Sequence, residues 1–96
     1  MKRKAVLNTL HTHRTEILQR GVKSLALFGS VARDEATSES DVDLLVEFEH
    51  SVGLFEFIGL QQYLESLLGC KVDLGTTRSL KPYLKDQVLQ EAILVT

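Results

Sequence analysis

Polar and apolar side chains alternate most regularly over residues 41–48, the segment Asp-Val-Asp-Leu-Leu-Val-Glu-Phe. Alternation with a period of two is typical of a strand that buries one face. The expected apolar face consists of Val42, Leu44, Val46 and Phe48. The opposite face consists of Asp41, Asp43, Leu45 and Glu47. Shorter apolar runs predict two more strands, at residues 22–28 and 70–75.

Helical spacing of apolar residues predicts long helices over residues 4–20 and 54–68, and a last helix that begins at Pro82. A short helix is expected over residues 30–34, and loops at 36–40 and 49–53. In the middle helix, the residues expected to face the sheet are Leu54, Ile58, Leu64, Leu67 and Leu68. The aromatic residues expected mostly in the core are Phe55, Phe57 and Tyr63, and any of them outside the buried stripe would be a candidate partner surface. The expected buried stripe of the last helix is Leu84, Val88, Leu89, Ala92 and Ile93.

The predicted order is therefore helix, strand, helix, strand, helix, strand, helix, which indicates an α/β fold around one small sheet. With 96 residues and a mass of 10.8 kDa, the chain is expected to form a single domain over residues 1–96. Apolar residues make up 44% and charged residues 25%, which excludes a disordered, collagen-like or low-complexity chain.

Cysteine content and apolar runs favour a cytoplasmic protein. Cys70 is the single cysteine, so a disulfide framework is excluded and a reducing compartment is favoured. The apolar run after the basic N-terminus stops at Asn8, which is too short for a signal peptide, and no later run approaches a membrane span.

The net charge of −2 conceals a sharp division along the chain. Residues 1–33 carry seven Lys or Arg and one acid, whereas residues 34–66 carry nine Asp or Glu and no Lys or Arg. A solvated basic helix followed by an acidic loop would explain this division, and so would a cation site preceded by phosphate-binding groups. A pI near 5.9 argues against direct nucleic-acid binding.

Asp41 and Asp43 are candidate metal ligands because residues i and i+2 of a strand project to the same face. Two carboxylates about 4 Å apart near a protein surface repel by roughly 4 kcal/mol, and a hard cation such as Mg²⁺ relieves that repulsion. Asp73 alternates with Val72 and Leu74 in the third strand. If that strand lies beside residues 41–48, three carboxylates converge; otherwise, all three are ordinary exposed strand positions.

Gly29 and Ser30 follow the first strand and open the short helix, a position that favours an anion such as phosphate. Arg33 lies near the same helical face and could reach a phosphate or pair with Asp34 or Glu35. Taken alone, the Gly-Ser pair would indicate only a helix cap.

These motifs together resemble the minimal nucleotidyltransferases (MNT) of the DNA polymerase β superfamily. The resemblance rests on Gly29-Ser30-Val31-Ala32-Arg33, on Ser40-Asp41-Val42-Asp43-Leu44, on the later Asp73, and on the ending Leu80-Lys81-Pro82-Tyr83. It extends from about residue 20 to the end of the chain. The fold it implies is the nucleotidyltransferase fold, a small mixed β-sheet flanked by helices, in the α/β (α+β) class.

The resemblance implies that Gly29, Ser30 and Arg33 bind the nucleotide, with the β- and γ-phosphates of ATP held at Gly29 and Ser30. It implies that Asp41 and Asp43 bridge two Mg²⁺ ions, with Mn²⁺ as the alternative metal, and that Asp73 completes the catalytic site.

Many MNT proteins are antitoxins encoded beside a HEPN-domain toxin ribonuclease, and they resemble enzymes that transfer AMP from ATP to a toxin tyrosine. The expected partners are therefore ATP and a HEPN toxin, in an oligomeric complex. Two alternatives stay open: a non-catalytic antitoxin that acts by binding, and a nucleotidyltransferase that modifies a small molecule or RNA.

Overall fold

The computed structural model describes residues 2–37, 39–79 and 82–96 of the chain. In chain order its elements are α1 (Arg3–Thr12), α2 (Arg14–Gln19), β1 (Val22–Phe28), α3 (Gly29–Ala32), β2 (Val42–Phe48), α4 (Leu54–Leu68), β3 (Val72–Thr76), the 3₁₀ helix η1 (Thr77–Ser79), α5 (Pro82–Glu91) and β4 (Ile93–Leu94). Among the described residues, no helix combines the length and apolar character needed to cross a membrane.

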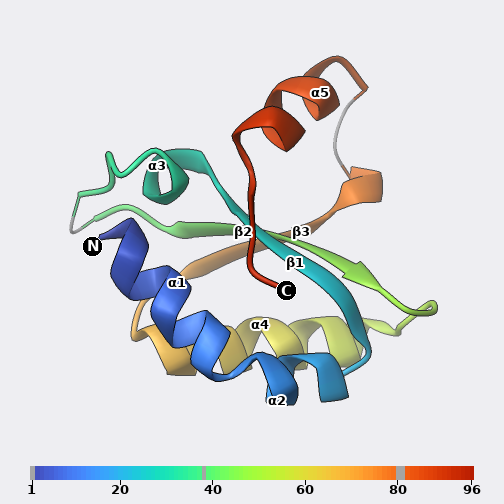
Figure 1. Ribbon diagram of the computed structural model, residues 1–96. Coiled ribbons are helices and arrows are strands. Elements are labelled where there is room, and N and C mark those ends of the chain that lie inside the picture. Colours follow the sequence, from blue (N-terminus) through green and yellow to red (C-terminus); the bar gives the residue numbers. More distant parts are fainter. Residues whose placement is uncertain (1, 38, 80–81) are drawn as a thin grey trace.

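The four strands form one mixed sheet in the order β3-β2-β1-β4. Strand β1 is antiparallel to both β2 and β4, whereas β2 and β3 are parallel. Helices α1, α2 and α4 cover one face of the sheet, and α3 and α5 lie on the other side (Figure 1). The predicted α+β architecture with a small mixed sheet is confirmed.

The main core lies between the sheet and the layer of α1, α2 and α4. Val42, Leu44 and Val46 of β2 are fully buried, as the alternation predicts. They belong to the same cluster as Leu10 of α1 and Leu64 of α4. Because successive strand residues point to opposite faces, Asp43 is directed to the side of α3.

The predicted helix over residues 4–20 is divided into α1 and α2 at His13. Side chains compete with the backbone at this point: Thr12 Oγ1 donates to the Asn8 carbonyl at 2.8 Å, and His13 Nδ1 lies 2.9 Å from the Thr9 carbonyl oxygen. Such local bonds bend or end helices.

The predicted buried face of α4 is wrong at two positions. Leu54 is 71% exposed and Ile58 is 37% exposed, whereas Leu60 and Leu64 are fully buried. At 100° per residue, Ile58 lies about 160° around the helix from Leu60, so the two cannot face the sheet together. The core placement predicted for Phe55 is also wrong, since its side chain is 88% exposed; Phe57 and Tyr63 are partly buried against the core.

The chain ends differently from the prediction, because α5 stops at Glu91 and Ile93 enters β4, which was not predicted. Backbone bonds tie this segment to β1, with Val95 N–H donating to the Leu25 carbonyl at 2.7 Å. Leu89 is 46% exposed rather than buried. Leu80, Lys81 and the side chain of Leu84 lie outside the described residues.

Side chains of α4 secure the first residue of β3. Gln61 Nε2 donates to the Val72 carbonyl at 2.9 Å, and the Val72 N–H donates to Glu65 Oε2 at 3.1 Å. We expect Gln61→Ala to lower the free energy of unfolding by about 1 kcal/mol, since it leaves a partly buried carbonyl without this donor. Replacing the exposed neighbour Gln62 by Ala should change it by less than about 0.5 kcal/mol. Urea denaturation measures both, and equal effects would contradict the assignment.

Candidate active site

The carboxylates of Asp43 and Asp73 project from adjacent positions on neighbouring strands. The two residues are direct partners in the parallel β2–β3 ladder, in which strands lie about 4.8 Å apart. Both residues point to the face opposite the main core. Asp43 is half-buried and Asp73 is exposed. Asp41 is exposed and immediately precedes β2.

The electrostatic environment raises the pKa of Asp43 from 3.8 to about 6. Burial of the carboxyl group is the largest cause, followed by the negative charges of Asp73 and Asp41. A hydrogen bond with the Asp73 side chain acts in the same direction, and the positive charge of Arg33 opposes it. At neutral pH the site therefore concentrates negative charge that a bound cation would relieve.

The donor set suits a hard cation, because Asp43 and Asp73 offer carboxylate oxygens, the ligands that Mg²⁺ prefers. Within the described ranges, no three Asp, Glu, His or Cys side chains are gathered closely enough to hold a metal ion. The structure thus brings Asp43 and Asp73 together and places Asp41 beside the start of β2. The ligand roles of all three residues remain predictions.

Gly29 brings the start of α3 directly against Asp43. Phe28, the residue before it, is the ladder partner of Asp43 in β1–β2. Gly29 adopts φ +74°, a conformation that favours glycine, and a Cβ at this position would overlap Asp43 Oδ2. The Gly29-Ser30 backbone therefore turns immediately beside the carboxylate pair, as the close approach of a phosphate to this site would require.

Gly29→Ala is expected to destabilise the protein more than Gly69→Ala. Gly69 has a similar φ of +69°, but no atom lies within 4 Å of the position that a Cβ would take. At either site, Ala in the left-handed backbone conformation lowers the free energy of unfolding by about 1–2 kcal/mol. At Gly29 we expect at least about 1 kcal/mol more, because the methyl group displaces Asp43 as well. Thermal unfolding of the two variants measures the difference, and equal losses would contradict the contact.

Arg33 is held by two glutamates at the end of α3. Its Nε lies 3.3 Å from Glu35 Oε2, and one terminal nitrogen lies 3.2 Å from Glu91 Oε2. These hydrogen bonds and charges raise the pKa of Arg33, with Glu35 as the largest cause. The pairing with Glu35 is one of the two predicted; Asp34 instead accepts a bond from the Arg3 backbone N–H at 3.1 Å.

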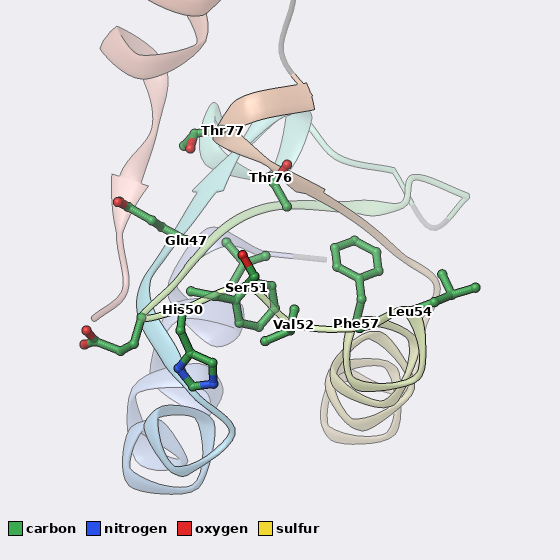
Figure 2. A pocket seen from close by; sticks show the side chains of 12 residues that line it. Glu47, His50, Ser51, Val52, Leu54, Phe57, Thr76 and Thr77 are labelled. Carbon is green, nitrogen blue, oxygen red and sulfur yellow. The ribbon is translucent and has the colours of Figure 1, made fainter.

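Sequence reasoning missed two features, one beside Arg33 and one at the far end of β2. Glu91 lies 58 residues from Arg33, and no local motif connects the two positions. A cavity of about 680 Å³ also opens where β2 ends and α4 begins (Figure 2). Its lining comes from segments that the sequence analysis assigned to separate elements, so only the folded chain joins them.

Residues 10–95 match the nucleotidyltransferase domain family. The protein adenylyltransferase MntA of Thermococcus cleftensis is 46% identical over 90% of this chain and 88% of its own length. A solved structure of a candidate minimal nucleotidyltransferase is 43% identical, with a TM-score of 0.77 over 97% of this chain and 95% of the other.

A crystal structure of a toxin–antitoxin with AMP-PNP contains a chain that is 25% identical, with a TM-score of 0.72 over 90% of this chain and 72% of the other. The family match covers the strands that carry Asp43 and Asp73 and the turn at Gly29. The family match spans nearly the whole chain, and the adenylyltransferase relative is identical at nearly half of the aligned positions. This chain therefore belongs to the nucleotidyltransferase domain family, and its enzyme class is that of a nucleotidyltransferase.

Proposed function

We propose that the protein transfers AMP from ATP to a tyrosine hydroxyl of a HEPN-domain toxin, in a reaction that requires Mg²⁺, and thereby acts as the antitoxin. The observation that carries this proposal is the pair of carboxylates, Asp43 and Asp73, directly beside the Gly29 turn. A protein adenylyltransferase among the relatives and a toxin–antitoxin among the structural neighbours support the choice of acceptor.

In the proposed reaction, the tyrosine oxygen forms a bond to the α-phosphorus of ATP. The bond between that phosphorus and the oxygen bridging to the β-phosphate breaks, pyrophosphate leaves, and the tyrosine proton passes to solvent. Divalent cations, when bound, supply positive charge at the phosphates and lower the pKa of the attacking hydroxyl.

The residues of the chain position the reactants. Asp43 and Asp73 would hold the cation, with Asp41 as the third acidic ligand. Gly29 and Ser30 would hold the triphosphate through backbone N–H groups and the Ser30 hydroxyl. Arg33 has five N–H donors and uses two of them for Glu35 and Glu91, so others remain available to a phosphate oxygen.

The test is mass spectrometry of a HEPN-domain toxin offered as acceptor, after incubation with the chain, ATP and MgCl₂. We expect a mass increase of one or more adenylyl groups, located on tyrosine, and no increase when EDTA replaces MgCl₂. An unmodified toxin with folded protein present would contradict the proposal. If Asp43→Asn still protects cells that express the toxin, neutralisation is by binding rather than by transfer.

A further inference from the structure

The cavity of about 680 Å³ lies at the opposite end of β2 and β3 from the carboxylates. Leu54 and Phe57 of α4 lie on one side of it, Thr76 of β3 and Thr77 of η1 lie above, and Glu47 and His50 lie on the other side (Figure 2). The cavity thus has an apolar wall from α4 and a mixed wall from the sheet and the following loop, in which Val46 and Phe48 lie beside Glu47 and Glu49.

An exposed apolar face adjoins this cavity on the first two turns of α4. It consists of Leu54, Phe55 and Ile58, which are 71%, 88% and 37% exposed. Spacings of three and four residues bring Ile58 beside both of the others on the helix surface. Contiguous apolar side chains of this kind are typical of surfaces that another protein covers. We call the cavity and this face together the docking surface.

The charge of the docking surface is negative. Glu47 and Glu49 line the cavity, and Glu56 lies over Gly53, where α4 begins. The whole segment of residues 34–66 contains no Lys or Arg. Lys23 pairs with Glu47 at 3.7 Å and offsets one of these charges. The Arg20 guanidinium also lies against α4, near Gly59 and over the Tyr63 ring, so the unpaired negative charge is concentrated at Glu49 and Glu56. The chemistry that fits this surface is therefore a basic segment with apolar or aromatic side chains.

The position of the docking surface relates it to the carboxylates. Glu47 lies four residues after Asp43 on β2, and its side chain points to the same face of the sheet. Because a strand rises about 3.3 Å per residue, the two residues are about 13 Å apart. The α4 side of the docking surface lies on the other face of the sheet from Asp43 and Asp73 (Figure 1). An acceptor seated there would reach the carboxylates by passing around the end of the sheet at Glu47.

We propose that the docking surface binds a basic, apolar-flanked segment of the protein acceptor and so sets which hydroxyl reaches the carboxylates. This inference rests on the proposed function, because it assigns the surface by which the same reaction selects its substrate. The segment places Lys or Arg against Glu47 and Glu49 and covers Phe55 with apolar side chains.

The experiment uses the HEPN-domain toxin that serves as acceptor in the test of the proposed function. It measures the dissociation constant of that toxin, and KM and kcat for its adenylylation. Phe55→Ser and Glu49→Lys alter the docking surface, and the exposed α5 residues Leu89→Ser and Asp86→Lys are matched controls. We expect each docking variant to weaken toxin binding at least 10-fold and to raise KM for the toxin, with kcat and the affinity for Mg-ATP unchanged. The controls should stay within twofold of the unsubstituted protein.

Glu49→Lys also gives a salt readout, because its loss of binding should diminish as NaCl is raised. Circular dichroism identifies a variant that has not folded, and the other docking variant then decides the result. Docking variants that bind as well as the unsubstituted protein, or controls that weaken binding equally, would overturn the inference. If the unsubstituted protein binds the toxin but transfers no AMP, the proposed function fails, while the binding constants still test the docking surface.

Discussion

Asp43→Asn is expected to lower the rate of AMP transfer at least about 1,000-fold, because it removes one of the two converging carboxylates and with it the charge that holds the cation. The same change should leave the fold intact. At pH 7 the ionised Asp43 carboxylate is destabilised by burial and by Asp73, as its pKa of about 6 shows. A neutral amide of the same shape removes this repulsion. Because solvent screens a half-buried group, the free energy of unfolding should rise by only on the order of 1 kcal/mol.

The rate of toxin adenylylation and the midpoint of urea unfolding test these two effects together. Glu39→Gln is the matched control, because Glu39 is an exposed acid of the same acidic segment and lies outside the strands. It should change neither quantity. Full activity in Asp43→Asn would contradict the assignment, and an unfolded variant would mean that the carboxylate serves structure instead.

The second large effect is a pH dependence governed by Asp43. Its pKa is about 6 in the folded protein, against about 3.9 for an unfolded Asp. Between these values the folded state binds more protons than the unfolded state, so the free energy of unfolding of the metal-free protein should fall as pH rises from about 4 through 6. This contribution is fully present below the unfolded pKa and is lost above the folded pKa.

Transfer activity should follow the opposite trend, because only the ionised carboxylate holds a cation. At Mg²⁺ concentrations well below saturation, where the metal-free carboxylate titrates, we expect a tenfold loss of rate for each pH unit below pH 6, or about 100-fold at pH 4 relative to pH 7. Urea unfolding in EDTA and initial transfer rates over the same pH range measure the two trends. An Asp43→Asn protein whose stability varies with pH as steeply as that of the unsubstituted protein would contradict this assignment.

The strands β1, β2 and β3 could be predicted because local signals encode them, and with them the placement of Asp43 beside Asp73 and Gly29. The alternation of residues 42–48 determines which side of β2 faces the main core, and this also determines where Asp43 points. Leu45 departs from the alternation, since it is apolar and buried on the Asp43 side. Gly29 marks a turn that admits no Cβ, since its φ is positive and Asp43 lies against it. The alternation concerns neighbours in the chain, whereas the Gly29 requirement combines the backbone conformation of Gly29 with a contact to the facing strand β2.

The features that sequence reasoning missed depend on contacts between distant segments. The bond from Arg33 to Glu91 exists because α5 returns to α3 after 58 residues. The two-residue strand β4 is too short for alternation to be visible, and it forms because β1 offers an open edge at Ala26 and Leu27. In α4, Leu54 and Leu64 have the same side chain, and only the position of the sheet makes the second buried and the first exposed.

The central claim is that Asp43 and Asp73 hold a divalent cation together with the triphosphate at Gly29. Isothermal titration calorimetry with ATP tests it most directly, in MgCl₂ and in EDTA, on the unsubstituted protein and on Asp43→Asn. We expect the unsubstituted protein to bind ATP saturably in MgCl₂, and we expect this binding to be lost in EDTA and in Asp43→Asn. A flat titration in MgCl₂, or binding of equal strength in EDTA, would contradict it.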